Sequence, residues 1–455
     1  MLNFIWLGLI LLGVLVGGFS GQFPAVVDGA IQGARNAVTL AIGLIGIMAL
    51  WLGVMRLAEQ AGMIQALARG LRPVLRWLFP DVPCDHPAMG SMVMNIAANM
   101  LGLTNAATPL GLRAMRDLES LNPIPGTATN AMCTFLAINT SSVQLIPMTA
   151  VAVMAAAGST HPSAIIGTAF LATLCSTAAG LSAVKLLERL RAFRLRLPPS
   201  QDMAPIEASP AATPLPSLSA ITDLSAPPAE VPAIEPRPLP AWGWPVLFAL
   251  LLTFAGFWLV GTFPQIVHQP LASESGPVLA RSVNVVSLLA IPFLLSFVLL
   301  YAALRRVEVY EQFVEGAKEG FHVAIRIIPY LVAMLVAIGV FRGGGGIELL
   351  TRLLDPALAA LGFPTELLPM ALIRPLTGTG TLALFSELVA THGPDSLIAR
   401  TAGTLFGSTE TTFYVVALYF GSVAVRRTRH AIPAGLIADA TGVVAAVVIC
   451  RWVFA

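Results

Sequence analysis

The stretch that decides the fold is 88-AMGSMVMNIAANMLGLTNAATPLGL-112. It is apolar enough to enter a bilayer, yet Ser91, Asn95 and Asn99 recur every four residues and therefore share one face of a helix. Because an unpaired amide in hydrocarbon is costly, that face must contact protein or a wet cavity.

The same stretch is interrupted before it can cross a membrane. Gly102, the pair Thr104-Asn105 and the pair Thr108-Pro109 break the helical pattern before roughly 20 residues are complete. Short, broken segments with a polar face are typical of binding sites in membrane proteins. The alternative is a helix–helix contact that uses small residues and amides.

The composition defines the class of protein. Of 455 residues, 56% are hydrophobic and only 11% are charged, whereas about a quarter are charged in soluble domains. We therefore expect a polytopic membrane protein whose first apolar run is a retained span, since no basic residue precedes it and no cleavage pattern follows. The net charge of +2 says nothing about nucleic acid by itself, but no basic run is interleaved with aromatic residues, so we expect no nucleic acid as a partner. Four cysteines imply no disulfide framework.

The hydropathy pattern predicts an all-α integral membrane protein with about nine full transmembrane helices plus two re-entrant hairpins. The hairpins are the broken runs 88–112 and 366–390. The full spans are predicted at 3–19, 37–55, 130–157, 163–183, 243–263, 282–301, 322–341, 399–424 and 432–453.

Lysine and arginine set the expected orientation, because cytoplasmic loops are rich in them. Five segments hold 18 of the 26 basic residues and are taken as cytoplasmic: 56–87, 112–129, 184–242, 302–321 and 425–431. They share one side only if 88–112 enters and leaves there, with 366–390 re-entering from the opposite face. The N-terminus is then cytoplasmic and the C-terminus outside.

The chain contains an internal repeat. The pattern V-x-G-A-x-x-G at 27–33 returns at 314–320 with an offset of 287, and 52–56 corresponds to 338–342 with an offset of 286. The charge count orients the two copies oppositely, so we expect two inverted-topology repeats, the architecture of alternating-access transporters. Chance similarity between Gly/Ala-rich helices is the alternative.

A proline-rich segment divides the chain. Residues 198–240 contain twelve prolines and form a predicted cytoplasmic linker without a core of its own. The expected domains are therefore 1–197, the linker 198–240, and 241–455.

Two spans are interrupted by polar runs. Asn139-Thr140-Ser141-Ser142 and Ser408-Thr409-Glu410-Thr411 cannot each share one helix face, so local unwinding at membrane depth is predicted. With the hairpins, these runs give the candidate substrate-binding residues Ser91, Asn95, Asn99, Thr104, Asn105, Asn139, Thr140, Ser141, Ser142, Arg374, Thr377, Thr379, Thr381, Ser408, Thr409, Glu410 and Thr411.

Ionisable residues at membrane depth are costly and are therefore functional candidates. Glu387, Glu410 and Asp439 are the candidate coupling or proton sites, for H⁺ or Na⁺. The structural alternative is an internal salt bridge between Arg374 and Glu410 or Glu387. Cys84-Asp85-His86 lacks a second pair of ligands at metal-site spacing, so we expect a loop and no metal.

Specific motifs resemble a known family. NIAANMLGLTNAATPLGLRAM (95–115) and MCTFLAINTSSVQLIP (132–147) resemble spore maturation protein A, while ALIRPLTGTGTL (371–382) and GSTETTFYVVALYFG (407–421) resemble spore maturation protein B. Both belong to the nucleoside recognition, or Gate, group. The resemblance implies a fusion of the two, a bacterial inner-membrane location, and a heteromer of this shape where the halves are separate.

These observations support two main hypotheses. The first is a transporter of a small polar solute, nucleoside-like, amino-acid-like or a small organic ion, with the bilayer as its surroundings and homo-oligomerisation left open. The second is a non-transporting scaffold for cell-envelope or spore-maturation enzymes. An intramembrane enzyme ranks lowest, because no HExxH, GxSxG or other nucleophile–base pattern is present; no catalytic residue and no cofactor are expected.

Overall fold

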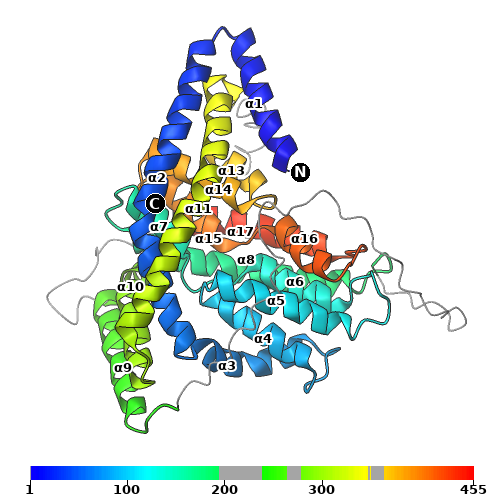
Figure 1. Cartoon of the computed structure of the whole chain (residues 1–455), viewed down its shortest axis with the longest axis vertical. Coiled ribbons are helices and arrows are strands. Elements are labelled where there is room, and N and C mark those ends of the chain that lie inside the picture. Colours follow the sequence, from blue (N-terminus) through cyan, green and yellow to red (C-terminus); the bar gives the residue numbers. More distant parts are fainter. Residues whose placement is uncertain (1, 194–237, 264–277, 347–348, 350–362, 455) are drawn as a thin grey trace, which may run out of the picture.

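The computed structural model describes residues 2–193, 238–263, 278–346, 349 and 363–454, and over these it is helical with no β-sheet (Figure 1). The predicted linker falls outside the described residues up to residue 237.

Six helices are long and apolar enough to cross a membrane, which makes this a multi-pass membrane protein. They are α2 (Phe23–Gln60), α8 (Ile165–Leu187), α9 (Gly243–Thr262), α10 (Val278–Leu304), α11 (Val309–Gly343) and α17 (Ala431–Phe454).

The expectation of about nine uninterrupted spans is only partly met. Helix α1 (Leu2–Phe19) is also apolar, but its apolar part Trp6–Phe19 is shorter than the six long helices. Two more predicted spans are divided into α6 (Asn130–Ser141) with α7 (Met148–Ala156), and α15 (Leu397–Ser408) with α16 (Thr412–Ser422). The polar runs cause both divisions.

Both broken apolar runs fold as helical hairpins, as predicted. Helix α4 (Pro87–Met100) turns at Gly102, which has a φ of +75°, into α5 (Thr104–Glu119). Helix α13 (Leu368–Ile373) turns into α14 (Gly378–His392), whose first turn is capped by the Thr377 hydroxyl, which accepts a hydrogen bond from the N–H of Gly380 at 3.3 Å. Re-entry into the bilayer stays a prediction.

Helices α2 and α11 pack antiparallel along glycines. Gly29 lies against Gly339 so closely that a Cβ on Gly29 would be 2.1 Å from the Gly339 carbonyl oxygen, and Gly316 lies against Gly53. In the sequence repeat, Gly29 corresponds to Gly316 and Gly53 to Gly339. The two contacts therefore exchange under the repeat.

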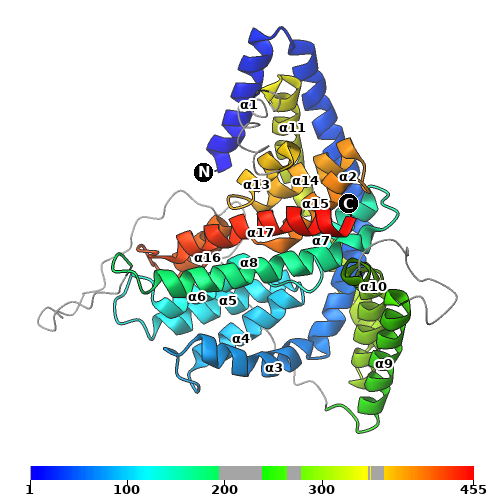
Figure 2. The same ribbon diagram turned by 180° about the vertical axis from the view of Figure 1, so that it is seen from behind.

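Helix α1 packs on α11, α9 pairs with α10, and most of the other helices form a layered unit beside α2 and α11 (Figure 2). Helices α8 and α17 lie side by side, with α6, α5 and α4 below α8 in the view of Figure 2. Apolar residues from both halves form two cores: one includes Phe135 and Tyr419, and the other includes Phe385 packed on Phe406. The halves thus interlock instead of folding side by side.

Two clasps join the halves, one at each end of this unit. In the first clasp, Asp395 accepts hydrogen bonds from the Ser159 hydroxyl at 2.7 Å and from the backbone N–H and hydroxyl of Thr160 at 3.0 and 2.8 Å. In the second clasp, the backbone N–H groups of Arg426 and Arg427 donate to the Gly126 carbonyl at 2.9 and 3.0 Å. Each clasp pairs one loop from each half.

Candidate functional site

The two interrupted spans cross at their breaks. Helix α6 ends at Ser141 and is followed by Ser142, whose φ of +31° is left-handed, and α15 ends at Ser408, before the extended residue Thr409. Between the breaks, the backbone N–H of Glu410 donates to the carbonyl of Thr140 at 2.7 Å. The predicted unwinding is therefore confirmed at both positions, and the freed backbone groups of one break are partly satisfied by the other.

An amide network connects the first hairpin to this crossing. Asn99 Nδ2 donates to Asn139 Oδ1 at 2.8 Å, and the Tyr419 hydroxyl donates to the same oxygen at 3.3 Å. Asn95 Nδ2 donates to the Tyr419 hydroxyl at 3.3 Å and to the Ala107 carbonyl at 2.8 Å. The predicted asparagine face thus packs against α6 and α16, and Tyr419 joins it without having been predicted.

Two carboxylates also lie near the crossing, those of Glu410 and Asp439. The Thr412 hydroxyl donates to Asp439 Oδ2 at 2.6 Å, which brings α16 onto the buried Asp439 of α17. Gln144 Nε2 donates to Glu410 Oε1 at 3.2 Å, so a side chain of the first half holds an acid of the second.

Arg374 stabilises the turn of the second hairpin. It is buried, its Nη2 donates to the Phe406 carbonyl at 2.9 Å, and its guanidinium lies over the Phe406 ring with 4.9 Å between Cζ and the ring centroid. Glu387 instead binds Arg342, with 2.5 Å between Oε1 and Nη2. The alternative of a salt bridge between Arg374 and Glu410 or Glu387 is therefore wrong, because Arg342 from α11 pairs with Glu387 and, over the described residues, Arg374 has no carboxylate within 4.0 Å.

Several buried oxygens around the crossing have no hydrogen-bond partner among the described protein groups. They are Thr140 Oγ1, Ser142 Oγ, Thr409 Oγ1, Asp439 Oδ1 and, in the amide network, Asn95 Oδ1. Buried polar atoms are nearly always paired in a finished core. These oxygens are therefore available to a polar ligand, an ion or water.

Comparison with known proteins identifies the architecture. The family profile described as Gate, nucleoside recognition, matches residues 41–160 and again 324–426. The chain is 48% identical over 172 residues to spore maturation protein B of Bacillus subtilis (strain 168), covering 38% of this chain and 97% of that protein. Spore maturation protein A of the same organism is 44% identical over 176 residues, covering 39% of this chain and 90% of that protein. This chain belongs to the Gate family.

One Gate copy lies within each predicted half of the chain. The N-terminal half resembles spore maturation protein A, and the C-terminal half resembles spore maturation protein B. Each copy contributes one hairpin and one interrupted span to the crossing. No solved structure matches this chain.

Other candidate residues of the Gate copies lie apart from the crossing or bond locally. The Ser91 hydroxyl donates to Asp117 Oδ2 at 2.5 Å, near the open end of the first hairpin. The hydroxyls of Ser141, Thr381 and Ser408 donate to carbonyls of their own helical turns, and those of Thr377 and Thr379 share a 3.2 Å hydrogen bond. Thr411 is buried beside Gly378. Thr104 and Asn105 begin α5, but their side chains lie outside the described residues.

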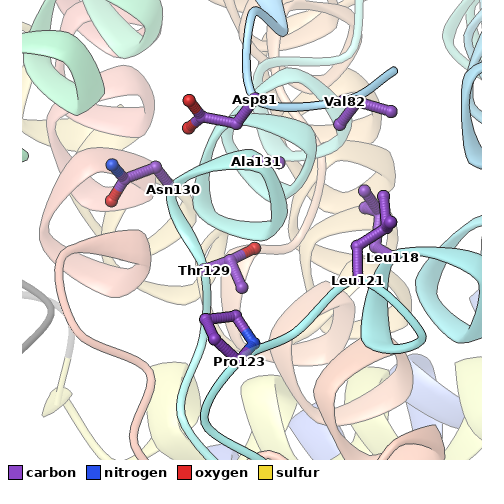
Figure 3. Close-up of a pocket in the computed structure, with 8 residues that line it drawn as sticks. All are labelled: Asp81, Val82, Leu118, Leu121, Pro123, Thr129, Asn130 and Ala131. Carbon is purple, nitrogen blue, oxygen red and sulfur yellow. The ribbon is translucent and has the colours of Figure 1, made fainter. Parts of the chain in front are cut away.

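A separate cavity of about 190 Å³ lies at the start of α6 in the first Gate copy (Figure 3). Its walls carry the side chains of Asp81, Thr129 and Asn130 together with Leu118 and Leu121. It is thus a feature distinct from the crossing, which lies at the other end of α6.

Proposed function

We propose that this Gate-family protein transports a small polar solute across the bacterial inner membrane by alternating access, with its solute site at the crossing. The observation that carries this proposal is the contact between the two breaks, where the N–H of Glu410 meets the carbonyl of Thr140 among unpaired oxygens. Transporters of inverted-repeat architecture bind solutes and ions at discontinuous helices of this kind.

The exchange of contacts under the repeat supports inverted copies. Exchanging the two copies turns the contact of Gly29 with Gly339 into the contact of Gly316 with Gly53. Oppositely oriented copies also require the equivalent helices α2 and α11 to pack antiparallel, as they do. On this proposal the N-terminus and the linker are cytoplasmic, and the two hairpins enter the membrane from opposite faces.

The amides and the carboxylates near the crossing suit different tasks. The amides of Asn95, Asn99 and Asn139 can donate to and accept from an uncharged polar group of the solute. Glu410 and Asp439 supply charge for an ionic group or for a coupling H⁺ or Na⁺. A nucleoside-like, an amino-acid-like and a small organic-ion solute all fit this inventory.

Deep burial of the same residues favours a second candidate, a scaffold for cell-envelope or spore-maturation enzymes. Asn95, Thr140 and Ser408 are fully buried, as a permanently closed core would have them. A scaffold would hold its partners through the linker or loops, whereas a transporter tolerates deletion of 198–237. Pull-down and flux assays on that deletion separate the two functions.

The decisive experiment uses Glu410→Gln. Purified protein is first screened for thermal stabilisation by nucleosides, amino acids and small organic acids, since a ligand that binds only the folded form raises the melting temperature. Compounds that stabilise it are then assayed for flux in proteoliposomes. We expect Glu410→Gln to reduce flux at least about tenfold, because the carboxylate that Gln144 holds is neutralised.

Glu311→Gln is the matched control, since Glu311 is an exposed acid of α11 far along the chain from the crossing. It should keep wild-type flux. Unchanged flux in folded Glu410→Gln would remove the crossing as the solute site. A pull-down that depends on the linker, with no flux for any stabilising compound, would favour the scaffold.

A further inference from the structure

Helix α3 (Met63–Leu78), which follows the long span α2, presents apolar residues in two directions. Ile64 and Leu75 are buried against the protein. Val74 and Trp77 lie on another side, and their exposed fractions are 57% and 81%. In a multi-pass membrane protein, exposed tryptophan of this kind is typical of the membrane–water interface.

Between these two apolar sides, α3 carries a stripe of arginines. Arg69, Arg72 and Arg76 are all exposed, and at 3.6 residues per turn they fall within roughly 60° of one another. None of the three pairs with a carboxylate within 4.0 Å among the described residues, as the ion pairs of this structure lie elsewhere. Their charge is therefore available to an external anion.

A cavity of about 540 Å³ opens beside this stripe, between α3 and the start of α4. Arg69 and Arg72 line it, and its acidic lining residue is Asp85. Over the described part of the chain, the two guanidinium groups make long hydrogen bonds to carbonyls, from Arg69 Nε to Gln65 at 3.4 Å and from Arg72 Nη2 to Cys84 at 3.5 Å. The cavity therefore has a net positive lining.

Helix α4 contributes an apolar part of the cavity wall, made of Met89, Val93 and Met94. A free inorganic anion gains nothing from such a wall, whereas a molecule with a phosphate and a hydrocarbon part can use both surfaces. The segment Cys84-Asp85-His86 also lines the cavity and is a loop, as its sequence predicted.

We propose that this cavity binds the headgroup of an anionic phospholipid. Arg69 and Arg72 hold the phosphate, Met89 and Val93 cover the glycerol end of the acyl chains, and Trp77 sits at the neighbouring interface. Arginine suits this role because its planar guanidinium bonds a phosphate with two N–H groups at once. The sequence places this segment on the cytoplasmic side, where basic segments next to a span attract anionic lipid.

The test measures lipid binding by the full chain. Protein in a neutral detergent is titrated with short-chain phosphatidylglycerol, with phosphatidylcholine of the same chain length, or with inorganic phosphate, and binding is followed by thermal shift and by native mass spectrometry. Each arginine near an anionic headgroup is worth about fivefold in affinity, so Arg69→Gln with Arg72→Gln should weaken phosphatidylglycerol binding about thirtyfold.

Arg116→Gln is the matched control. Arg116 is exposed on α5 and, like Arg69, donates from Nε to the carbonyl four residues earlier at 3.4 Å, so this variant should bind phosphatidylglycerol as wild type does. Equal binding of phosphatidylcholine, equal stabilisation by inorganic phosphate, or an unchanged affinity of the double variant would each overturn the proposal. Neither readout depends on transport.

Discussion

Replacing Gly29 by alanine tests the closest helix contact in the protein. A Cβ there would lie 2.1 Å from the Gly339 carbonyl oxygen, whereas real Cβ atoms essentially never approach closer than 3.0 Å. Helices α2 and α11 would therefore have to separate by roughly 1 Å, and overpacking of this kind costs about 1–3 kcal/mol. Alanine returns about 0.5–1 kcal/mol through its greater helix propensity. The difference between the two ranges is a net loss of up to about 2.5 kcal/mol.

Gly46→Ala in the same helix is the control. A Cβ at Gly46 meets no atom within 4 Å, so only the propensity term acts and the variant should gain about 0.5–1 kcal/mol. Thermal unfolding in detergent should therefore move the melting temperatures of the two variants in opposite directions. Gly316→Ala should behave like Gly29→Ala, since its Cβ would lie 2.5 Å from the Leu52 carbonyl. A Gly29→Ala protein that is stabilised as much as Gly46→Ala would refute the close packing of α2 on α11.

Two further variants probe the clasp and the amide network. Burial raises the pKa of Asp395, but the hydrogen bonds from Thr160 and Ser159 outweigh burial and hold this pKa below its ordinary value. The stabilisation that the Asp395 carboxylate gives the fold is therefore present above its unfolded pKa of about 4 and is lost as the pH falls below that value. Asp395→Asn should cost about 1–3 kcal/mol of unfolding free energy at pH 7. The control Asp28→Asn, which changes an exposed acid, should stay near wild type. A difference in melting temperature between Asp395→Asn and wild type that stays the same below about pH 4 would contradict this reasoning. Tyr419→Phe removes the hydroxyl between Asn95 and Asn139 and should cost about 1–2 kcal/mol of unfolding free energy. The control Tyr414→Phe should cost little, because the Tyr414 side chain is 56% exposed. Equal melting temperatures of the two variants would mean that the amide network contributes no stability.

The local features of this fold could be predicted from the sequence because they depend on neighbouring residues. The cluster of Gly102 with nearby Thr, Asn and Pro, and the polar run from Asn139, both disfavour a continuous helix, so the first hairpin and the first interrupted span could be predicted from the local order of residues. The glycine repeat predicted that α2 and α11 are equivalent segments of the two halves, but their packing against each other is seen only in the structure.

Partners distant in sequence could not be predicted in the same way. Nothing near Glu387 shows that Arg342 of another helix reaches it before Arg374 does, because that choice depends on how α11 packs on α14. Tyr419 was missed for a related reason. A tyrosine in an apolar helix usually satisfies its hydroxyl locally or at an interface, and only the packing of α16 on the first hairpin brings it to Asn95.

The hydrogen bond between Thr140 and Glu410 has a consequence for synthesis. Its donor is made 270 residues after its acceptor, which at 5–20 residues per second is a delay of roughly 15–50 s. During that time the nascent first half lies in the bilayer with its broken span uncovered, a costly arrangement in hydrocarbon. The newly inserted segment therefore has to be sheltered, by the insertion machinery or by water held around it, until the ribosome has delivered its counterpart.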